Sequence, residues 1–311
     1  MNLSTRGYLI EEPEREHDAV RALVQLRFIA EKILCPLAIN VYFCWFILRL
    51  RKDRLLPARV GDIDLLAGLL EWNDPNEFPL RFEEAKRQWP QWHESHAAFF
   101  AAQTLANEGR IKWPPPTSHL VAIEAKCAYL NPAATDVRLE SFKSTKMSKA
   151  KIAHTRAQIR DLLDMGFDRV ALLDVIANPP GGGADGQAWL AAGSLADDSR
   201  RVLMPALARR LSSDTAAGHW VWSAGAVLGG NESQRGAGYP LEVRTAVQNP
   251  LLSDRRGSSR RKQLEEKLRS EFENLPAPLN LDVVFVDCDR CRKIHHGSEL
   301  CDCKVQKSGG R

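Results

Sequence analysis

Two short stretches of the chain place acidic and basic side chains among apolar residues. One reads Gly-Asp-Ile-Asp-Leu-Leu-Ala and contains Asp62 and Asp64; the other reads Ile-Glu-Ala-Lys and contains Glu124 and Lys126. In a β-strand, residues two apart share a face, so each stretch predicts a polar pair on one side and apolar residues on the other. If the two strands are neighbours, one face of the sheet collects two or three carboxylates and one lysine.

Such a group of side chains predicts metal-assisted hydrolysis. Carboxylates held close together repel one another unless a proton or a cation intervenes, and hard oxygen ligands favour Mg²⁺ or Mn²⁺. An ion of this kind activates water for attack on a phosphodiester, and a neighbouring lysine can orient or deprotonate that water or neutralise developing charge. The alternative is a solvated sheet face with cross-strand salt bridges.

The hydrophobic periodicity predicts strands that alternate with helices, which indicates an α/β fold. A turn is expected at 53–57, and a helical insertion is expected to occupy about 72–116. The predicted helices are 15–33, 82–108, 146–165 (with Gly166 as its cap) and 255–272. The predicted strands are 41–50, 59–67, 119–129, 169–176, 219–228 and 281–286. We expect one domain over residues 1–250 and a basic helix with a small C-terminal element over 251–311.

These residues and this order of elements resemble the PD-(D/E)XK nuclease superfamily over roughly residues 15–177. The resemblance implies a restriction-endonuclease-like mixed central sheet flanked by helices. It implies a Mg²⁺- or Mn²⁺-dependent deoxyribonuclease, an endonuclease rather than an exonuclease, with DNA as its partner. The resemblance also suggests a role in defence against foreign DNA. Other expectations for this chain are a partner that is an ATPase or another defence-system subunit, beside which alone it would be active, and assembly as a homo-oligomer.

Site residues follow from the resemblance position by position. Asp64 resembles the metal-binding aspartate, although Asp62 could be the ligand if the register differs. Glu124 resembles the second metal ligand, and the backbone carbonyl of Ala125 the third. Lys126 resembles the catalytic lysine. Gln158 falls in the following helix, where related nucleases place a glutamine or a basic residue near the phosphate.

Four cysteines cluster near the end of the sequence as Cys288-x-x-Cys291 and Cys301-x-Cys303. Two close pairs separated by a short loop are typical of a tetrahedral Zn²⁺ site, and four thiolates would make the zinc structural. His295 or His296 could substitute for one cysteine. Two disulfides or four free thiols are the other interpretations.

The overall charge and the hydropathy of the chain limit the partners and the location that we expect. Lys and Arg number 43 against 39 Asp and Glu, a formal net charge of +4, which is compatible with a polyanionic partner. The most apolar stretch, residues 33–48, is shorter than the roughly 20 residues that span a bilayer, so no membrane partner is expected. The first 17 residues do not resemble an export signal, and we expect a cytoplasmic protein. The alternative function is a non-catalytic, zinc-stabilised protein that binds nucleic acid or a partner.

Overall fold

The computed structural model describes thirteen separate parts of the chain. They are residues 44–92, 94–117, 119–130, 142–143, 149–177, 205, 207–212, 215–224, 240–242, 252, 258–277, 284–288 and 291–296. Among the described residues, unit 1 comprises those within Ile123–Asp164 and Arg169–Leu252. Unit 2 comprises those within Leu34–Ala122, Met165–Asp168 and Ser253–Arg311.

Unit 2 is built on a mixed sheet in the order β2-β1-β8-β9. Strands β1 and β2 are antiparallel, β1 and β8 parallel, and β8 and β9 antiparallel. The strands are β1 (Cys44–Arg51), β2 (Asp62–Leu69), β8 (Val284–Asp287) and β9 (Ile294–His296). The helices are α3 (Lys52–Leu55), α4 (Glu77–Gln88), α5 (Glu94–Asn107) and α8 (Ser259–Glu273).

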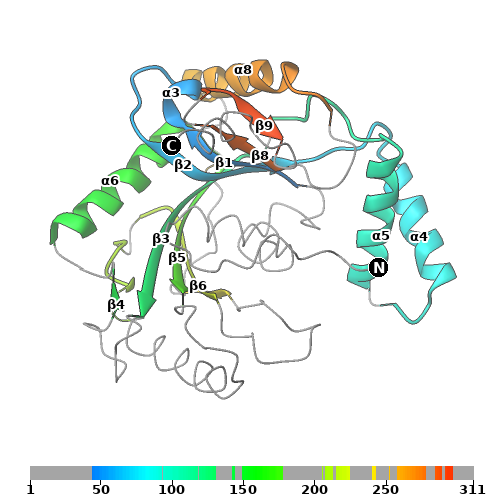
Figure 1. Ribbon diagram of the computed structural model, residues 1–311, viewed down its shortest axis with the longest axis horizontal. Helices are drawn as coiled ribbons and strands as arrows, with labels where there is room; N and C mark the ends of the chain where they lie inside the picture. Colours follow the sequence, from blue (N-terminus) through cyan, green and yellow to red (C-terminus); the bar gives the residue numbers. More distant parts are fainter. Residues whose placement is uncertain are drawn as a thin grey trace, which may run out of the picture. The chain divides into compact units, whose positions relative to one another are not determined.

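Helix α8 lies along the strands of unit 2 through one apolar face (Figure 1). Leu264, Leu268 and Phe272 recur every four residues on that face, and all three are buried. The Phe272 ring meets Trp45 of β1 edge-on at 4.8 Å and Phe285 of β8 at 5.8 Å between ring centroids. Aromatic burial of this kind attaches the helix to the sheet.

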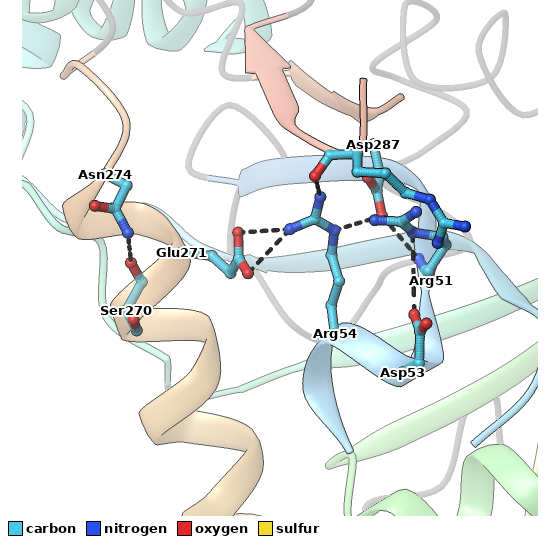
Figure 2. Close-up of polar contacts among 8 residues, drawn as sticks. Arg51, Asp53, Arg54, Ser270, Glu271, Asn274 and Asp287 are labelled. Atoms are coloured by element: carbon cyan, nitrogen blue, oxygen red, sulfur yellow. Dashed lines mark hydrogen bonds and ion pairs between the residues drawn. The ribbon is translucent and has the colours of Figure 1, made fainter. Parts of the chain in front are cut away.

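Arg54 of α3 joins three segments that are far apart in the sequence (Figure 2). Its guanidinium donates to Asp287 of β8 at 2.9 Å, to both oxygens of Glu271 in α8 at 3.1 Å, and to the carbonyl of Arg292. Asp287 also accepts from the backbone and side chain of Arg51. Burial lowers the pKa of Arg54, but the charges and hydrogen bonds of Asp287 and Glu271 raise it above its ordinary value.

The insertion between β2 and β3 is a pair of helices, α4 and α5, that lie side by side (Figure 1). The prediction of a single helix over 82–108 is therefore wrong. Trp89 makes the last helical hydrogen bond, to Ala85, and then leaves the α region because Pro90 follows it. Trp89 and Trp92 stack at 4.3 Å across the break. Gly109, with φ +68, lies just beyond the C-terminal end of α5, where a left-handed residue commonly ends a helix.

Unit 1 has a second mixed arrangement of strands, in the order β7-β6-β5-β3, with β4 paired to β3. Strands β5 and β6 are parallel, whereas β6–β7 and β3–β4 are antiparallel. The elements are β3 (Val121–Leu130), β4 (Phe142–Lys143), α6 (Lys149–Met165), β5 (Arg169–Ala177), β6 (Gly218–Ala224) and β7 (Pro240–Glu242). Strand β3 begins in unit 2 and enters unit 1 at Ile123.

The predicted α/β class, with mixed sheets and flanking helices, is confirmed. Gly166 ends α6 with φ +93, as expected of a helix cap. The turn predicted at 53–57 includes the short helix α3 instead. The helix predicted over 15–33 lies outside the described residues. No described helix is long and apolar enough to cross a membrane.

Candidate active site

Glu124 and Lys126 lie two residues apart on β3, so their side chains share a face. Glu124 is 2% exposed and the Lys126 side chain 15%. The Lys126 ammonium donates to Glu124 Oε1 at 2.6 Å and to the backbone carbonyl oxygen of Ala125 at 3.0 Å. A buried carboxylate and a main-chain carbonyl therefore hold one positive charge between them.

The two oxygens around the ammonium are of the type that a hard divalent cation prefers. The Glu124 carboxylate and the Ala125 carbonyl both lie within hydrogen-bond distance of one Nζ atom. Both could therefore contact an ion placed close to the position of that atom. The Glu124 carboxylate and the Ala125 carbonyl are thus two oxygen donors of a kind that would fit a Mg²⁺ or Mn²⁺ ion. Lys126 adjoins both groups.

Asp62 and Asp64 belong to β2 in unit 2. Asp64 is 5% exposed, whereas Asp62 is half-buried at the start of the strand and pairs in register with Arg51. Asp64 lies between Ile63 and Leu65, which are both fully buried. Burial therefore favours Asp64 over Asp62 as the residue with a specialised role, because a carboxylate kept from water needs a compensating charge or hydrogen bonds.

Gln158 projects from α6 in unit 1, next to Ile159 at the core of the helix. The residue is half-buried, yet its Oε1 atom is buried and accepts no hydrogen bond from the described residues. A buried amide oxygen without a donor costs free energy, so it is a suitable place for a water or ligand to bind.

The solvated-face interpretation does not fit these residues. Glu124 and Asp64 are 2% and 5% exposed, so neither carboxylate lies on a water-covered sheet face. The structure brings Glu124, Ala125 and Lys126 together in unit 1, and it holds Asp64 and Asp62 in unit 2.

A second buried polar cluster in unit 1 was not predicted from the sequence. Asp174 of β5 accepts a hydrogen bond from Arg210 and lies 2.7 Å from Nε2 of His219 on β6. All three residues are buried, and Arg156 of α6 donates to the Arg210 carbonyl at 3.2 Å. The one feature of the sequence that could have indicated this cluster is Asp174, a carboxylate among the apolar residues of β5. Because its charges face one another away from water, this cluster fits a structural role.

The four cysteines divide between described and undescribed residues. Cys288 and Cys291 lie near the turn between β8 and β9, and both are half-buried. Cys301 and Cys303 lie outside the described residues. Within the part of the chain that the structure describes, no group of three or more His, Cys, Asp or Glu side chains is arranged to hold a metal ion.

Comparison of the chain with protein-family models, with curated proteins and with solved structures finds no match.

Proposed function

We propose that this chain is a metal-dependent nuclease that hydrolyses phosphodiester bonds of DNA, with a restriction-endonuclease-like fold. The observation that carries the proposal is the position of the Lys126 ammonium, 2.6 Å from Glu124 Oε1 and 3.0 Å from the Ala125 carbonyl oxygen. A lysine beside two hard oxygen ligands is the local arrangement that the Ile-Glu-Ala-Lys sequence predicts for such an enzyme.

In this proposal Asp64, Glu124 and the carbonyl of Ala125 hold Mg²⁺ or Mn²⁺. The bound ion would polarise the scissile phosphate and lower the pKa of an attacking water. Burial of Asp64 and Glu124 supports the assignment, because a carboxylate at 5% or 2% exposure interacts more strongly with a cation than one in bulk water does.

The other residues act on the water and the phosphate. Lys126 orients the attacking water and offsets negative charge that develops on the phosphate oxygens. The Gln158 amide holds the water or the phosphate through its buried oxygen or its NH₂ group. Asp62, half-buried on the same strand as Asp64, assists with a second carboxylate. Lys151, exposed on α6, can neutralise a DNA phosphate without reading sequence.

The test is cleavage of covalently closed plasmid and of linear DNA across a Mg²⁺ and Mn²⁺ titration. We compare wild type with Asp64→Asn, Glu124→Gln and Lys126→Ala, each checked for folding by circular dichroism. Loss of the lysine is expected to lower the rate by about 10²- to 10⁴-fold. Cutting of closed circles identifies an endonuclease.

The matched control is Glu71→Gln, because it makes the same chemical change at an exposed carboxylate. Glu71 is 45% exposed and pairs with Lys112 on the surface. It should leave cleavage within about twofold, as expected for an exposed ion pair. If the protein binds DNA but cleaves it in the presence of none of the metals, the proposed function would change from a nuclease to a non-catalytic DNA-binding protein. Cleavage that survives all three site substitutions would place the active site elsewhere.

A further inference from the structure

A short turn of unit 1, residues 207–212, is anchored by a buried ion pair. Arg210 of the turn is buried, and its guanidinium donates to the buried carboxylate of Asp174 on β5. The same carboxylate lies 2.7 Å from Nε2 of His219 on β6. The backbone N–H of Arg210 donates to the Leu207 carbonyl at 2.9 Å, which closes the turn. The charge of Arg210 is therefore used inside the protein, where it fixes the position of the turn.

Helix α6 binds the backbone of the same turn. Arg156 of α6 is half-buried, and its Nε donates to the Arg210 carbonyl at 3.2 Å while its Nη2 donates to the Arg209 carbonyl at 2.9 Å. A guanidinium presents its donors as a rigid fork, so one side chain can bind two successive carbonyls. Both peptide groups next to the Arg209 side chain are thereby attached to the helix.

The exposed side chains next to these contacts are two further arginines. Arg209 lies on the turn and Arg160 on α6, and both are exposed. Within the part of the chain that the structure describes, neither guanidinium forms a hydrogen bond or an ion pair. Residues four apart on a helix are neighbours, so Arg160 follows Arg156 along one side of α6. Because Arg156 joins the turn to this side of the helix, Arg209 and Arg160 belong to one local surface.

The order of charges along α6 is the reverse of what the helix itself favours. Its first turn contains Lys149 and Lys151 and no acidic residue, whereas Asp161 and Asp164 lie near its C-terminal end. The helix macrodipole favours acidic residues at the N-terminal end and basic residues at the C-terminal end. Basic residues that do not serve the stability of the helix point to a negatively charged partner on this part of unit 1.

We propose that Arg160 and Arg209 bind phosphate groups of the DNA backbone, and that Arg156, Arg210 and Asp174 are positioning residues that hold Arg209 for this contact. Arginine suits the role because its guanidinium forms bidentate hydrogen bonds with phosphate oxygens. Such contacts add affinity without reading sequence, so this surface should bind duplexes of any sequence. The inference rests on the proposed function for the identity of the polyanion as DNA, but not on cleavage.

The test measures how the affinity for a labelled DNA duplex depends on salt, with EDTA present so that binding is scored whether or not the chain cleaves. The slope of log affinity against log salt should fall by about 0.9 for each lost phosphate contact, in Arg160→Gln and in Arg209→Gln. Between about 50 and about 200 mM NaCl, the deficit of each variant should therefore shrink about threefold. Arg87→Gln is the matched control, because it removes the same charge from an exposed position on α4, and it should keep the wild-type slope.

Asp174→Asn distinguishes positioning from overall charge. The substitution removes a negative charge, so it should tighten DNA binding if net charge alone mattered. If Asp174 holds the turn that presents Arg209, the slope should instead fall by about 0.9, as in Arg209→Gln. Arg156→Lys keeps the charge and replaces the fork that binds two carbonyls, so it should give the same reduction and serves if Asp174→Asn does not fold.

The outcomes separate this inference from the nuclease proposal. Wild-type slopes in Arg160→Gln and Arg209→Gln would overturn the inference even if the chain cleaves DNA. An equal reduction in Arg87→Gln, or a wild-type chain that binds no duplex, would overturn it as well. Reduced slopes in a chain that never cleaves would support this surface and reject the nuclease. Wild-type slopes in the folded positioning variants would overturn the roles of Asp174 and Arg156.

Discussion

Replacing Lys126 by methionine distinguishes two roles for this residue: a lysine that adjoins a metal site, and a lysine in an ordinary buried ion pair. The substitution removes the ammonium and keeps most of the apolar stem. Glu124, at 2% exposure, then loses its 2.6 Å partner. Breaking a buried pair from one side costs about 3–5 kcal/mol, and the 15% exposure of the lysine side chain places the expected loss near 2–4 kcal/mol. For a chain of this length, that lowers Tm by roughly 4–8 °C in the absence of metal.

Metal should reverse this loss, because the variant no longer holds a positive charge against the proposed ligands, Glu124 and the Ala125 carbonyl. At about 4 Å and a water-like dielectric constant, an ammonium and a divalent ion repel by roughly 2 kcal/mol. The variant should therefore bind Mn²⁺ about 30-fold more tightly than wild type while it loses cleavage. Calorimetric titration measures the affinity, and thermal unfolding with and without Mn²⁺ measures the stability.

Lys112→Met is the control, since Lys112 is 56% exposed and pairs with Glu71 at 3.1 Å on the surface. It should change stability by less than about 1 kcal/mol and leave Mn²⁺ affinity unaltered. If Lys126→Met weakens Mn²⁺ binding, or changes stability and affinity no more than the control, the reasoning about Glu124 and Ala125 as metal ligands is refuted.

Three further substitutions test other parts of the structure. Arg261→Met removes a 2%-exposed guanidinium from its buried carboxylate partner and two backbone carbonyls, and it should cost about 3–5 kcal/mol in chemical denaturation, whereas the exposed Arg260→Met should cost little. Gly68→Ala should cost about 1–3 kcal/mol, because the added Cβ would lie 2.2 Å from Trp45 Cζ2; an unchanged Tm would contradict that packing. Gln158→Leu should keep or raise Tm, since it removes a buried oxygen that has no donor among the described residues, yet slow DNA cleavage by at least about tenfold; cleavage at the wild-type rate would exclude Gln158 from the proposed site.

Local sequence pattern predicted the part of the site that depends on alternation within one strand. Glu124 and Lys126 share a face and touch because β3 is extended over them. The pattern could not tell that Asp64 would be buried while Asp62 stays half-exposed. That difference depends on tertiary packing around β2, which alternation within one strand does not encode.

The errors in the fold have local and long-range causes. Pro90 breaks the predicted helix over 82–108, and its effect on Trp89 was readable from the sequence. Strand β9 is three residues long and contains two histidines, so hydropathy did not reveal it. The contact of Arg54 with Asp287 joins residues 233 positions apart, and such pairs have no local signature.

Strand β8 also has a protective consequence for the chain. It pairs with β1 from Phe46 to Leu48, a stretch that is at most 4% exposed and apolar on both faces. Without β8, the N–H and C=O groups of that stretch would form an open, hydrophobic sheet edge, which is a template for pairing with another molecule. A chain shortened to end before Val284 should therefore self-associate edge to edge. By covering this edge, β8 lowers the tendency of the protein to aggregate.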